Sequence, residues 1–225
     1  MKIISLYDYS IIQTLEHEEE VYRVVERNNN QLISSTKNGY IHFWDKKNNE
    51  KYKYIQKFKV FKERSHIDLL LINNNELVIT NEAESIIKFW NLNTNQTVLV
   101  LKNANKIYFD KISKILYTND VQKDSSNKYI ETGKFNIIDT KKKILIGHIS
   151  IGEKGSYITH CFDYNIILRN IYGETYFFNV DYEEGNVEIS YLSIICNCNY
   201  YHQFLIHNNK LKTIHIISKE EYKAP

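Results

Sequence analysis

The sequence predicts an all-β protein in which a small four-stranded sheet is repeated about five times. A strand-end signature recurs along the chain: IHFWD at 41–45 returns as IKFWN at 87–91, with weaker copies ISLYD, FNIID and YFFNVD. The Asp or Asn that closes each copy falls at position 8, 45, 91, 139 or 181, which gives steps of 37, 46, 48 and 42 residues. A repeat near forty residues with a Trp-Asp strand end is typical of a β-propeller blade.

Composition supports the same fold class. Aromatic residues make up 13% of the 225 residues, with 18 Tyr and 10 Phe, and these side chains suit a pleated, half-buried strand. No segment has the apolar period of 3.6 residues that predicts a helix. Turns are needed throughout, yet there are only 7 Gly and 1 Pro. Clustered Asn residues take over the turns, because Asn tolerates positive φ and closes a turn with its own side chain.

The expected strands are short runs rich in Ile, Val, Phe and Tyr, each bounded by Asn, Asp, Gly or Ser. The chain begins with Lys2–Tyr7 and Ser10–Leu15. The first unit follows as Val21–Val25, Gln31–Ser35, Tyr40–Trp44 and Lys51–Phe58. The second is Ile67–Ile72, Glu76–Thr80, Ile86–Trp90 and Thr97–Leu101. The third is Ala104–Phe109, Lys114–Thr118, Gly133–Ile138 and Lys143–Ile146. The fourth is Ser156–Cys161, Asn165–Arg169, Thr175–Val180 and Val187–Leu192. The last begins with Ile194–Cys198, Phe204–His207 and Lys212–Ile217.

A second motif precedes the units. Gly147-His148 is an intact Gly-His pair, and His17 keeps the His without the Gly; each His follows a closing Asp by nine residues. With the Trp-Asp step, this pattern resembles the WD-repeat β-propeller family. The resemblance implies a structural signature with these members: His17, Trp44, Asp45, Trp90, Asn91, Asp139, Gly147, His148 and Asp181.

In that family a buried tetrad joins the imidazole to an Asp six residues before the Trp, with a Ser or Thr and the Trp itself. This chain has Asn38, Glu84, Thr132 and Glu174 at the Asp position. The network is therefore expected to be partial, and the blades more deformable than is usual.

We expect a single propeller domain over 1–225, with repeat units near 16–58, 59–102, 103–147, 148–192 and 193–218, and with 1–15 supplying extra strands. Three arrangements remain open: a five-bladed ring with one frayed strand, an open ring, or a part of a larger propeller. An open ring would expose strand edges that can pair with another chain.

Charge, hydropathy and cysteine content indicate where in the cell the protein acts. The formal net charge is +2, no apolar run approaches a membrane span, and the N-terminus lacks a signal-peptide core. Three Cys residues without a disulfide spacing fit a reducing compartment. We therefore expect an intracellular protein, cytoplasmic or nuclear.

The most basic stretch, KYKYIQKFKVFK at 51–62, carries Lys51, Lys53, Lys57 and Lys59. Interleaved basic and aromatic residues can hold a single nucleic-acid strand. The favoured interpretation is an outer strand whose lysines face water and discourage edge pairing. Cys196 and Cys198, with His202 and His207, are the one cluster of soft metal ligands, and we expect no metal there.

No catalytic motif is present. The resemblance to the WD-repeat family implies a non-catalytic protein–protein interaction scaffold that uses the loops at one end of the blades. We expect the partner to be another protein rather than nucleic acid, and we expect no cofactor, small-molecule substrate or membrane span. The alternative is a structural subunit whose incomplete propeller is completed by a partner, and a lesser alternative is a nucleic-acid-binding module. The candidate loops are 16–20, 37–39, 61–66, 82–85, 121–131 and 150–155.

Overall fold

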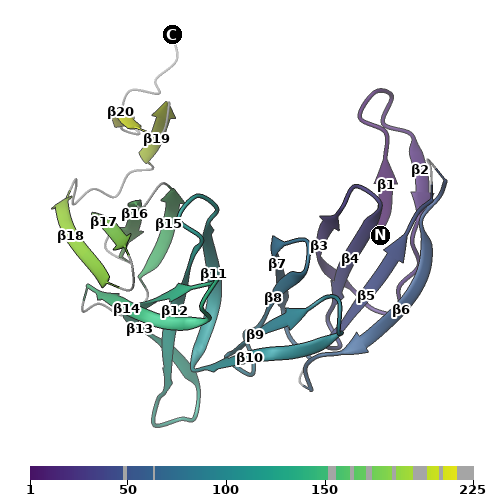
Figure 1. The fold of residues 1–225 in the computed structure, drawn as a ribbon, viewed down its shortest axis with the longest axis horizontal. Coiled ribbons are helices and arrows are strands. Elements are labelled where there is room, and N and C mark those ends of the chain that lie inside the picture. Colours follow the sequence, from purple (N-terminus) through teal and green to yellow (C-terminus); the bar gives the residue numbers. More distant parts are fainter. Residues whose placement is uncertain are drawn as a thin grey trace. The chain divides into compact units, whose positions relative to one another are not determined.

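The computed structural model describes residues 1–47, 50–62, 64–151, 156–162, 165–170, 174–183, 186–194, 202–207 and 210–216. All the regular structure in these ranges is β-strand (Figure 1). The strands form four sheets of four strands and two sheets of two, and the strands of each sheet are consecutive in the chain. Two compact units are present, Met1–Ile107 and Tyr108–Pro225. Each is described by itself, and the single domain over 1–225 stays a prediction.

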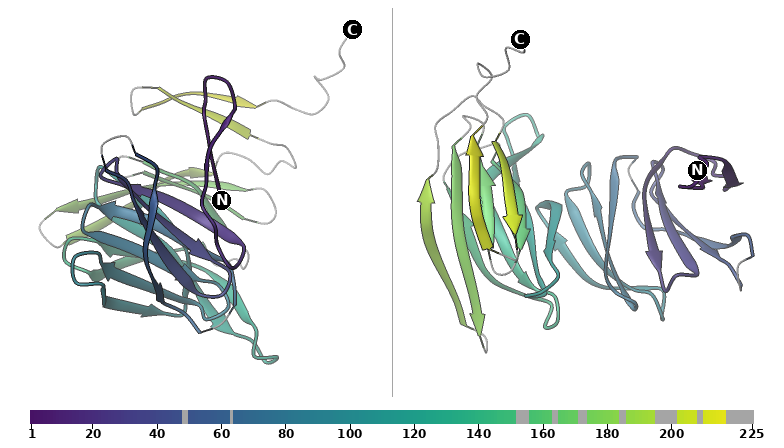
Figure 2. Two further views of the ribbon diagram at one scale, coloured as in Figure 1. Left: turned by 90° about the vertical axis from the view of Figure 1, so that its right-hand side faces the viewer. Right: turned by 90° about the horizontal axis from the view of Figure 1, so that it is seen from above.

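The first unit contains one hairpin and two sheets. The hairpin is β1 (Lys2–Ile4) with β2 (Ile11–Thr14). The first sheet is β3 (Val21–Arg27), β4 (Gln31–Thr36), β5 (Tyr40–Asp45) and β6 (Lys53–Lys59). The second is β7 (Ile67–Asn73), β8 (Glu76–Asn81), β9 (Ile86–Asn91) and β10 (Gln96–Lys102). Figure 2 shows the turn of the β1–β2 hairpin extending beyond the edge of sheet β3–β6.

The core of the first unit lies between its two sheets. Alternate residues of a strand point to opposite faces, so Ile33, Ile41 and Phe43 line one face of sheet β3–β6. They pack with Leu77, Ile79 and Trp90 of the second sheet, and all six are buried. The face of the second sheet that carries Trp90 is therefore covered by the first sheet.

The second unit repeats this construction. Its first sheet is β11 (Ala104–Asp110), β12 (Ile115–Lys123), β13 (Tyr129–Asp139) and β14 (Ile144–Ser150). The next is β15 (Tyr157–Phe162), β16 (Asn165–Arg169), β17 (Thr175–Glu183) and β18 (Asn186–Ile194), and the hairpin is β19 (His202–His207) with β20 (Lys210–Ile216). Tyr117, Phe135 and Ile137 of the first sheet pack with Ile166 and Leu168 of the next.

The closing Asp or Asn of the repeated signature has a physical role in the turn that follows it. The side-chain oxygen of Asn91 accepts the backbone N–H groups of residues 93 and 94, at 2.9 and 3.1 Å. Asp139 accepts those of residues 141 and 142, at 2.7 and 2.9 Å. Asp8 accepts that of Ser10 at 3.2 Å. Asn91 and Asp139 end a strand and start the turn into the next, whereas Asp8 lies inside the turn between β1 and β2. In each case an Asx side chain helps to close the turn in place of the backbone.

Several strand limits differ from those expected. The segment 121–131 is not a loop: β12 continues to Lys123 and β13 begins at Tyr129, so the insertion lengthens a hairpin that projects from its sheet (Figure 1). Strand β14 continues through Gly147 and His148 to Ser150, beyond the expected end at Ile146. Ile194 ends β18 instead of beginning a new strand. Cys196, Cys198 and residues 152–155 lie outside the described residues.

Candidate binding surface

The second face of sheet β3–β6, which we call the Trp44 face, collects aromatic and polar side chains. The pairing register places Trp44 between Leu32 and Tyr54. It also places His42 between Ser34 and Lys57. Residues two apart on one strand share a face, so Trp44 and His42 point the same way. Both are 5% exposed.

Three side chains on this face form one hydrogen-bonded chain. The indole Nε1 of Trp44 donates to Ser34 Oγ at 3.0 Å, and Ser34 Oγ lies 2.8 Å from Nε2 of His17. The other ring nitrogen of His17, Nδ1, lies 3.0 Å from the carbonyl oxygen of Leu15. Because that carbonyl can only accept, Nδ1 carries the proton and Nε2 accepts the Ser34 hydroxyl. With a neutral imidazole, each polar atom in this series of hydrogen bonds then has a donor or acceptor partner.

The surroundings favour neutral imidazoles. Burial lowers the pKa of His17, outweighing its hydrogen bond to the Leu15 carbonyl. Burial, followed by the charges of His17 and Lys57, lowers the pKa of His42 to about 4. The two rings lie 5.0 Å apart between centroids, and the His17 and Trp44 rings lie 4.9 Å apart. Protonating either imidazole would place a charge in a buried site, which is costly because the charge loses its hydration.

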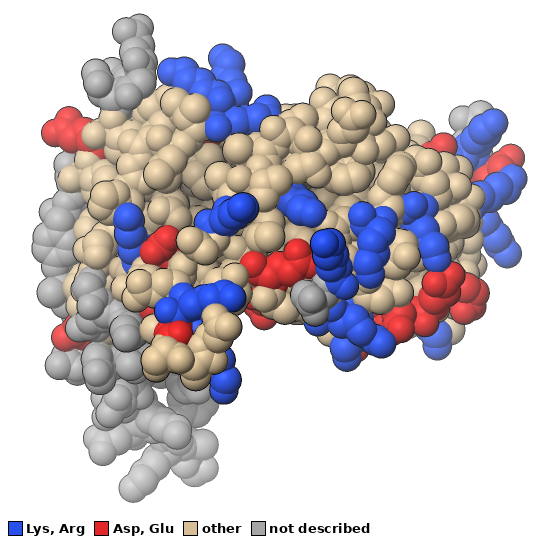
Figure 3. Space-filling model, turned by 90° about the horizontal axis from the view of Figure 1, so that it is seen from below, with Lys and Arg blue, Asp and Glu red and all other residues tan. Residues whose placement is uncertain are grey.

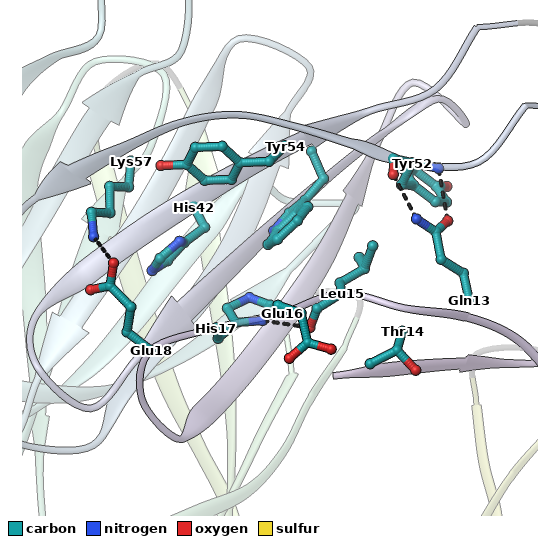
Figure 4. A pocket seen from close by; sticks show the side chains of 11 residues that line it. Gln13, Thr14, Leu15, Glu16, His17, Glu18, His42, Tyr52, Tyr54 and Lys57 are labelled. Atoms are coloured by element: carbon teal, nitrogen blue, oxygen red, sulfur yellow. Dashed lines mark hydrogen bonds and ion pairs between the residues drawn. The ribbon is translucent and has the colours of Figure 1, made fainter.

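A cavity of about 510 Å³ lies between this face and the segment that leads from the hairpin into β3. We call it the N-terminal groove, and Figure 4 shows the two sides facing one another. It is lined by Gln13, Thr14, Leu15, Glu16, His17, Glu18, His42, Trp44, Tyr52, Tyr54 and Lys57. The Gln13 amide holds one end closed, since it donates to the Tyr52 carbonyl oxygen at 2.6 Å and accepts the Tyr52 N–H at 2.8 Å.

The acidic loop before β3 is largely neutralised by cations. Glu18 pairs with Lys57 at 2.7 Å, Glu19 with Arg64 at 2.7 Å, and Glu20 with Lys37 at 3.3 Å. Glu16 has no ion-pair partner among the residues that the structure describes. These pairs are solvent-exposed and so contribute little stability each. The α-ammonium of Met1 adds a positive charge near Glu16, since it donates to the Leu15 carbonyl oxygen at 2.9 Å.

Lysine side chains of the basic stretch interact with neighbouring residues. Lys57 pairs with Glu18, and Lys53 pairs with Glu50 at 3.3 Å. The Lys59 ammonium donates to the Asn38 carbonyl oxygen and lies 4.8 Å from the centroid of the Tyr40 ring. Lys51 is exposed and precedes β6. On the face drawn in Figure 3, acidic side chains lie beside the basic ones.

Among the side chains that the structure describes, the other signature residues do not form a second copy of this hydrogen-bonded chain. Asn38 accepts the Thr36 hydroxyl at 2.9 Å, while the two ring nitrogens of His17 bond to Leu15 and Ser34 instead. His148 is exposed in the middle of β14, with Gly147 beside it. Asp45 ends β5, and Asp181 lies inside β17 opposite Glu188. The indole N–H of Trp90 is buried, and no acceptor among the described residues lies within hydrogen-bond distance.

The contrast between the two tryptophans comes from the turn before each. Residues 37–39 connect β4 to β5, whereas 82–85 connect β8 to β9, one residue more. The position that pairs with the residue two before the Trp is Ser34 in the first sheet and Ile79 in the second. Ile79 offers no oxygen to Trp90. In the sequence, the residue ten positions before each Trp carries a hydroxyl group: Ser34 before Trp44 and Thr80 before Trp90. Sequence spacing alone therefore does not reveal that only Trp44 has a hydroxyl partner.

Sequence reasoning identified His17, Trp44 and the loop 16–20 but not the residues that complete the groove. Ser34, His42, Tyr54 and Gln13 were missed because each lies in an ordinary strand pattern. Only the pairing register brings them to one face. Within the described ranges, no group of three or more His, Cys, Asp or Glu side chains is arranged to hold a metal ion.

Solved structures share this architecture at low sequence identity. A chain of the mitotic checkpoint complex matches with a TM-score of 0.62 and 11% identity, over 88% of this chain and 61% of that one. The Cps50 (Swd1) β-propeller domain of Myceliophteria thermophila matches with a TM-score of 0.56 and 13% identity, over 86% and 65%. This chain has a β-propeller fold.

This propeller chain is shorter than the structures that it resembles. A protein from Lactobacillus plantarum matches with a TM-score of 0.60 and 11% identity, over 86% of this chain and 63% of that one. The chain thus spans about three fifths of the length of these structures. No protein-family model and no curated protein matches its sequence. Among the described residues, no helix has the length and apolarity to cross a membrane.

Proposed function

We propose that this propeller chain is a non-catalytic protein-interaction module that binds a protein partner beside its N-terminal groove. The observation that carries the proposal is the exposure of large apolar side chains on the β1–β2 hairpin: Leu6 is 90% exposed, Tyr7 97% and Tyr9 79%. Apolar side chains gathered at one exposed site are typical of interaction surfaces. The adjacent sheet is preformed, so binding there requires little ordering of the scaffold.

The chemistry of the groove argues against catalysis. Ser34 and His17 are hydrogen-bonded like a nucleophile and its base. However, Ser34 is 0% exposed and its oxygen already accepts the Trp44 indole N–H. A hydroxyl that substrate cannot reach does not act as a nucleophile. The pair is better explained as a structural link between the loop and the sheet.

Affinity capture from source cells tests the proposal. The bait is the full chain, compared with a variant carrying Leu6→Ser and Tyr7→Ser. The matched control is Ile112→Ser, which removes an apolar side chain that is 58% exposed elsewhere. We expect one set of proteins to be retained by the unmodified chain and the control and to fall about tenfold with the double variant, because exposed aromatic and apolar anchors dominate interfaces. Equal capture by all three baits, or capture by none, contradicts the proposal.

A second candidate is a structural subunit completed by another chain. It is favoured by the two sheets that have two strands each among the described residues, β1–β2 and β19–β20, because the other sheets have four. Open strand edges favour pairing with further strands. This candidate predicts that the isolated chain self-associates or is poorly soluble. A monodisperse monomer in light scattering contradicts it.

For both candidates we propose an intracellular site of action, cytoplasmic or nuclear. The odd number of cysteines supports this, because unpaired thiols are typical of reducing compartments.

A further inference from the structure

We propose that β10 is an edge through which the chain associates with a second copy of itself, the two β10 strands pairing antiparallel. The inference goes beyond the interaction function proposed above and does not depend on it. Three observations carry it: the place of β10 in its sheet, the absence of charge along it, and the exposure of its apolar side chains.

Strand β10 is the outer strand of its sheet (Figure 1). The strand order is β10-β9-β8-β7, so one edge of β10 pairs with β9, and no strand within the described ranges pairs with the other edge. Alternate N–H and C=O groups of a strand point to its two edges, so part of the β10 backbone faces away from the sheet. Such a row of backbone groups is a template for another strand.

The regular part of this edge is the segment 99–102. It pairs residue by residue with 86–89 of β9, whereas the register shifts between Thr97 and Leu99. A bulge bends and twists an edge and so opposes pairing. The segment that offers itself to a second copy is therefore 99–102, with Val98 at its start.

No charge along this edge repels a second copy. The sequence has no Asp, Glu, Lys or Arg between Lys88 and Lys102. The outer strand of the other four-stranded sheet in this unit, β6, differs because it carries Lys53, Lys57 and Lys59. Lysines along an edge strand prevent edge-to-edge pairing. Strand β10 lacks that protection.

Branched apolar side chains of β10 are open to solvent. Val98 is 48% exposed and Val100 is 43% exposed, and the strand contains neither Gly nor Pro. Such a composition suits a paired strand. Strand β14, the outer strand of the corresponding sheet in the second unit, differs on both counts. It contains Gly147, and β18 packs beside it, since Val187 would lie 3.5 Å from a Cβ added at that glycine.

Charge self-complementarity identifies the occupant as a second copy. Two copies related by a two-fold axis present the same edge to one another, and their strands run antiparallel. The single charged residue of the segment, Lys102, then lies near the uncharged start of the segment in the other copy. Like charges directly opposite one another destabilise a pair of strands, and this arrangement avoids them. Val100 lies near the middle, where the apolar side chains of the two copies meet.

The association is expected to be weak, because four residues from each copy form an interface far smaller than that of a stable dimer. Sedimentation velocity of the full chain tests it over a range from about 5 to about 500 µM, the range in which small interfaces associate. We expect the fraction of dimer to rise steadily with concentration.

Variants locate the interface. Val100→Lys is expected to weaken association at least about tenfold, because it brings like charges together across the two-fold axis. Val100→Thr keeps a branched side chain and should retain the association. The matched control is Ile55→Lys, which adds the same charge at a residue that is 51% exposed on β6, and it should associate as the unmodified chain does. Circular dichroism checks that each variant is folded.

Hydrogen exchange of the unmodified chain provides a second measurement that needs no variant. Amides of β10 should exchange more slowly at high than at low protein concentration, while those of β6 stay unchanged. Exchange of β10 that is independent of concentration overturns the proposal. So does a monomer at every concentration, or equal weakening by Val100→Lys and Ile55→Lys.

Self-association that persists in Val100→Lys also overturns the proposal, and it would support completion of the two-stranded sheets instead. The capture experiment with the β1–β2 hairpin uses substitutions on a different sheet. Its failure therefore leaves the sedimentation result standing, and a monomer in sedimentation does not alter the capture result.

Discussion

Trp44 donates its indole N–H to the hydroxyl oxygen of Ser34 across 3.0 Å. This bond joins the third strand of the first sheet to the second, and through His17 it reaches the carbonyl of Leu15. The loop that borders the N-terminal groove is thereby tied to the sheet by buried polar groups. Trp90, at the same place in the next repeat, lacks such a partner among the described residues.

The two tryptophans should therefore respond differently to the same substitution. Both are buried, and Trp→Phe removes a similar volume from each. Trp44→Phe also removes a satisfied hydrogen bond, whereas Trp90→Phe removes a buried donor without an acceptor. We expect Trp44→Phe to lower the free energy of unfolding by about 1 to 3 kcal/mol more than Trp90→Phe. Urea denaturation followed by circular dichroism measures both, and equal losses would count against the hydrogen-bonded chain.

Stability should fall as the pH is lowered from about 6.5 to about 4. The folded state holds the pKa of His42 at about 4, below its ordinary value of 6.5. Between these values the unfolded state binds more protons, so the stabilisation is full above pH 6.5 and is lost progressively toward pH 4. The loss is on the order of 3 kcal/mol, at about 1.4 kcal/mol per pKa unit.

The control for this pH dependence is His42→Gln, which keeps an amide in place of the imidazole. Urea midpoints measured from pH 7 to pH 4 should fall less steeply for the variant than for the unmodified chain. His17, whose pKa is also lowered, leaves a smaller residual dependence of the same sign. Parallel curves for the two proteins would show that His42 does not titrate as proposed.

Gly39 is expected to be intolerant of substitution. Its φ is +86°, and a Cβ added there would collide with the Phe61 carbonyl oxygen. Its own carbonyl oxygen accepts the N–H of Val60 at 2.8 Å, which ties the β4–β5 turn to the segment before β7. Gly39→Ala should cost about 2 kcal/mol or more, since both the backbone and the contact are strained.

The matched control is Gly147→Ala. There the nearest atom to an added Cβ is Val187 Cγ1 at 3.5 Å, an ordinary contact. We expect a change within about 1 kcal/mol, because alanine also restricts the unfolded chain. Chemical denaturation of both variants provides the comparison. A larger loss for Gly147→Ala than for Gly39→Ala would show that the turn at Gly39 has room for a side chain.

The basic stretch should not bind nucleic acid. Lys53, Lys57 and Lys59 each have a local partner, and acidic side chains lie close to them. Fluorescence anisotropy with a labelled single strand should show no saturable binding at micromolar protein and moderate salt. Charge reversal at Lys51, Lys53, Lys57 and Lys59 should leave the signal unchanged. Binding that weakens steeply with salt and disappears in the variant would instead indicate phosphate contacts.

The repeated signature was a reliable guide to the fold because it reports strand periodicity and turn chemistry. The recurring Asn91 and Asp139 each close a turn through their own side chains, and such a local interaction depends on neighbouring residues only. The prediction of a loop at 121–131 was wrong. The ends of this segment pair with one another, as Val121 opposite Glu131 shows, and pairing between segments is not encoded by either segment alone.

The groove could be anticipated only in part. The sequence drew attention to His17, Trp44 and the acidic loop, but it did not reveal that Ser34 joins the first two. That contact depends on a three-residue turn, which sets the register of β4 against β5. A turn longer by one residue brings Ile79 to the corresponding position of the second sheet. A shift in register exchanges the side chains that meet across a pair of strands.

By itself, the amino-acid sequence determined that this protein is built of repeated antiparallel sheets, because apolar alternation and Asx turns act over a few residues. Only the tertiary structure decided which side chains share the Trp44 face, and that three of the four acids in the loop pair with Lys or Arg side chains. Those outcomes depend on distances between strands and loops that lie far apart in the chain, and packing alone sets such distances.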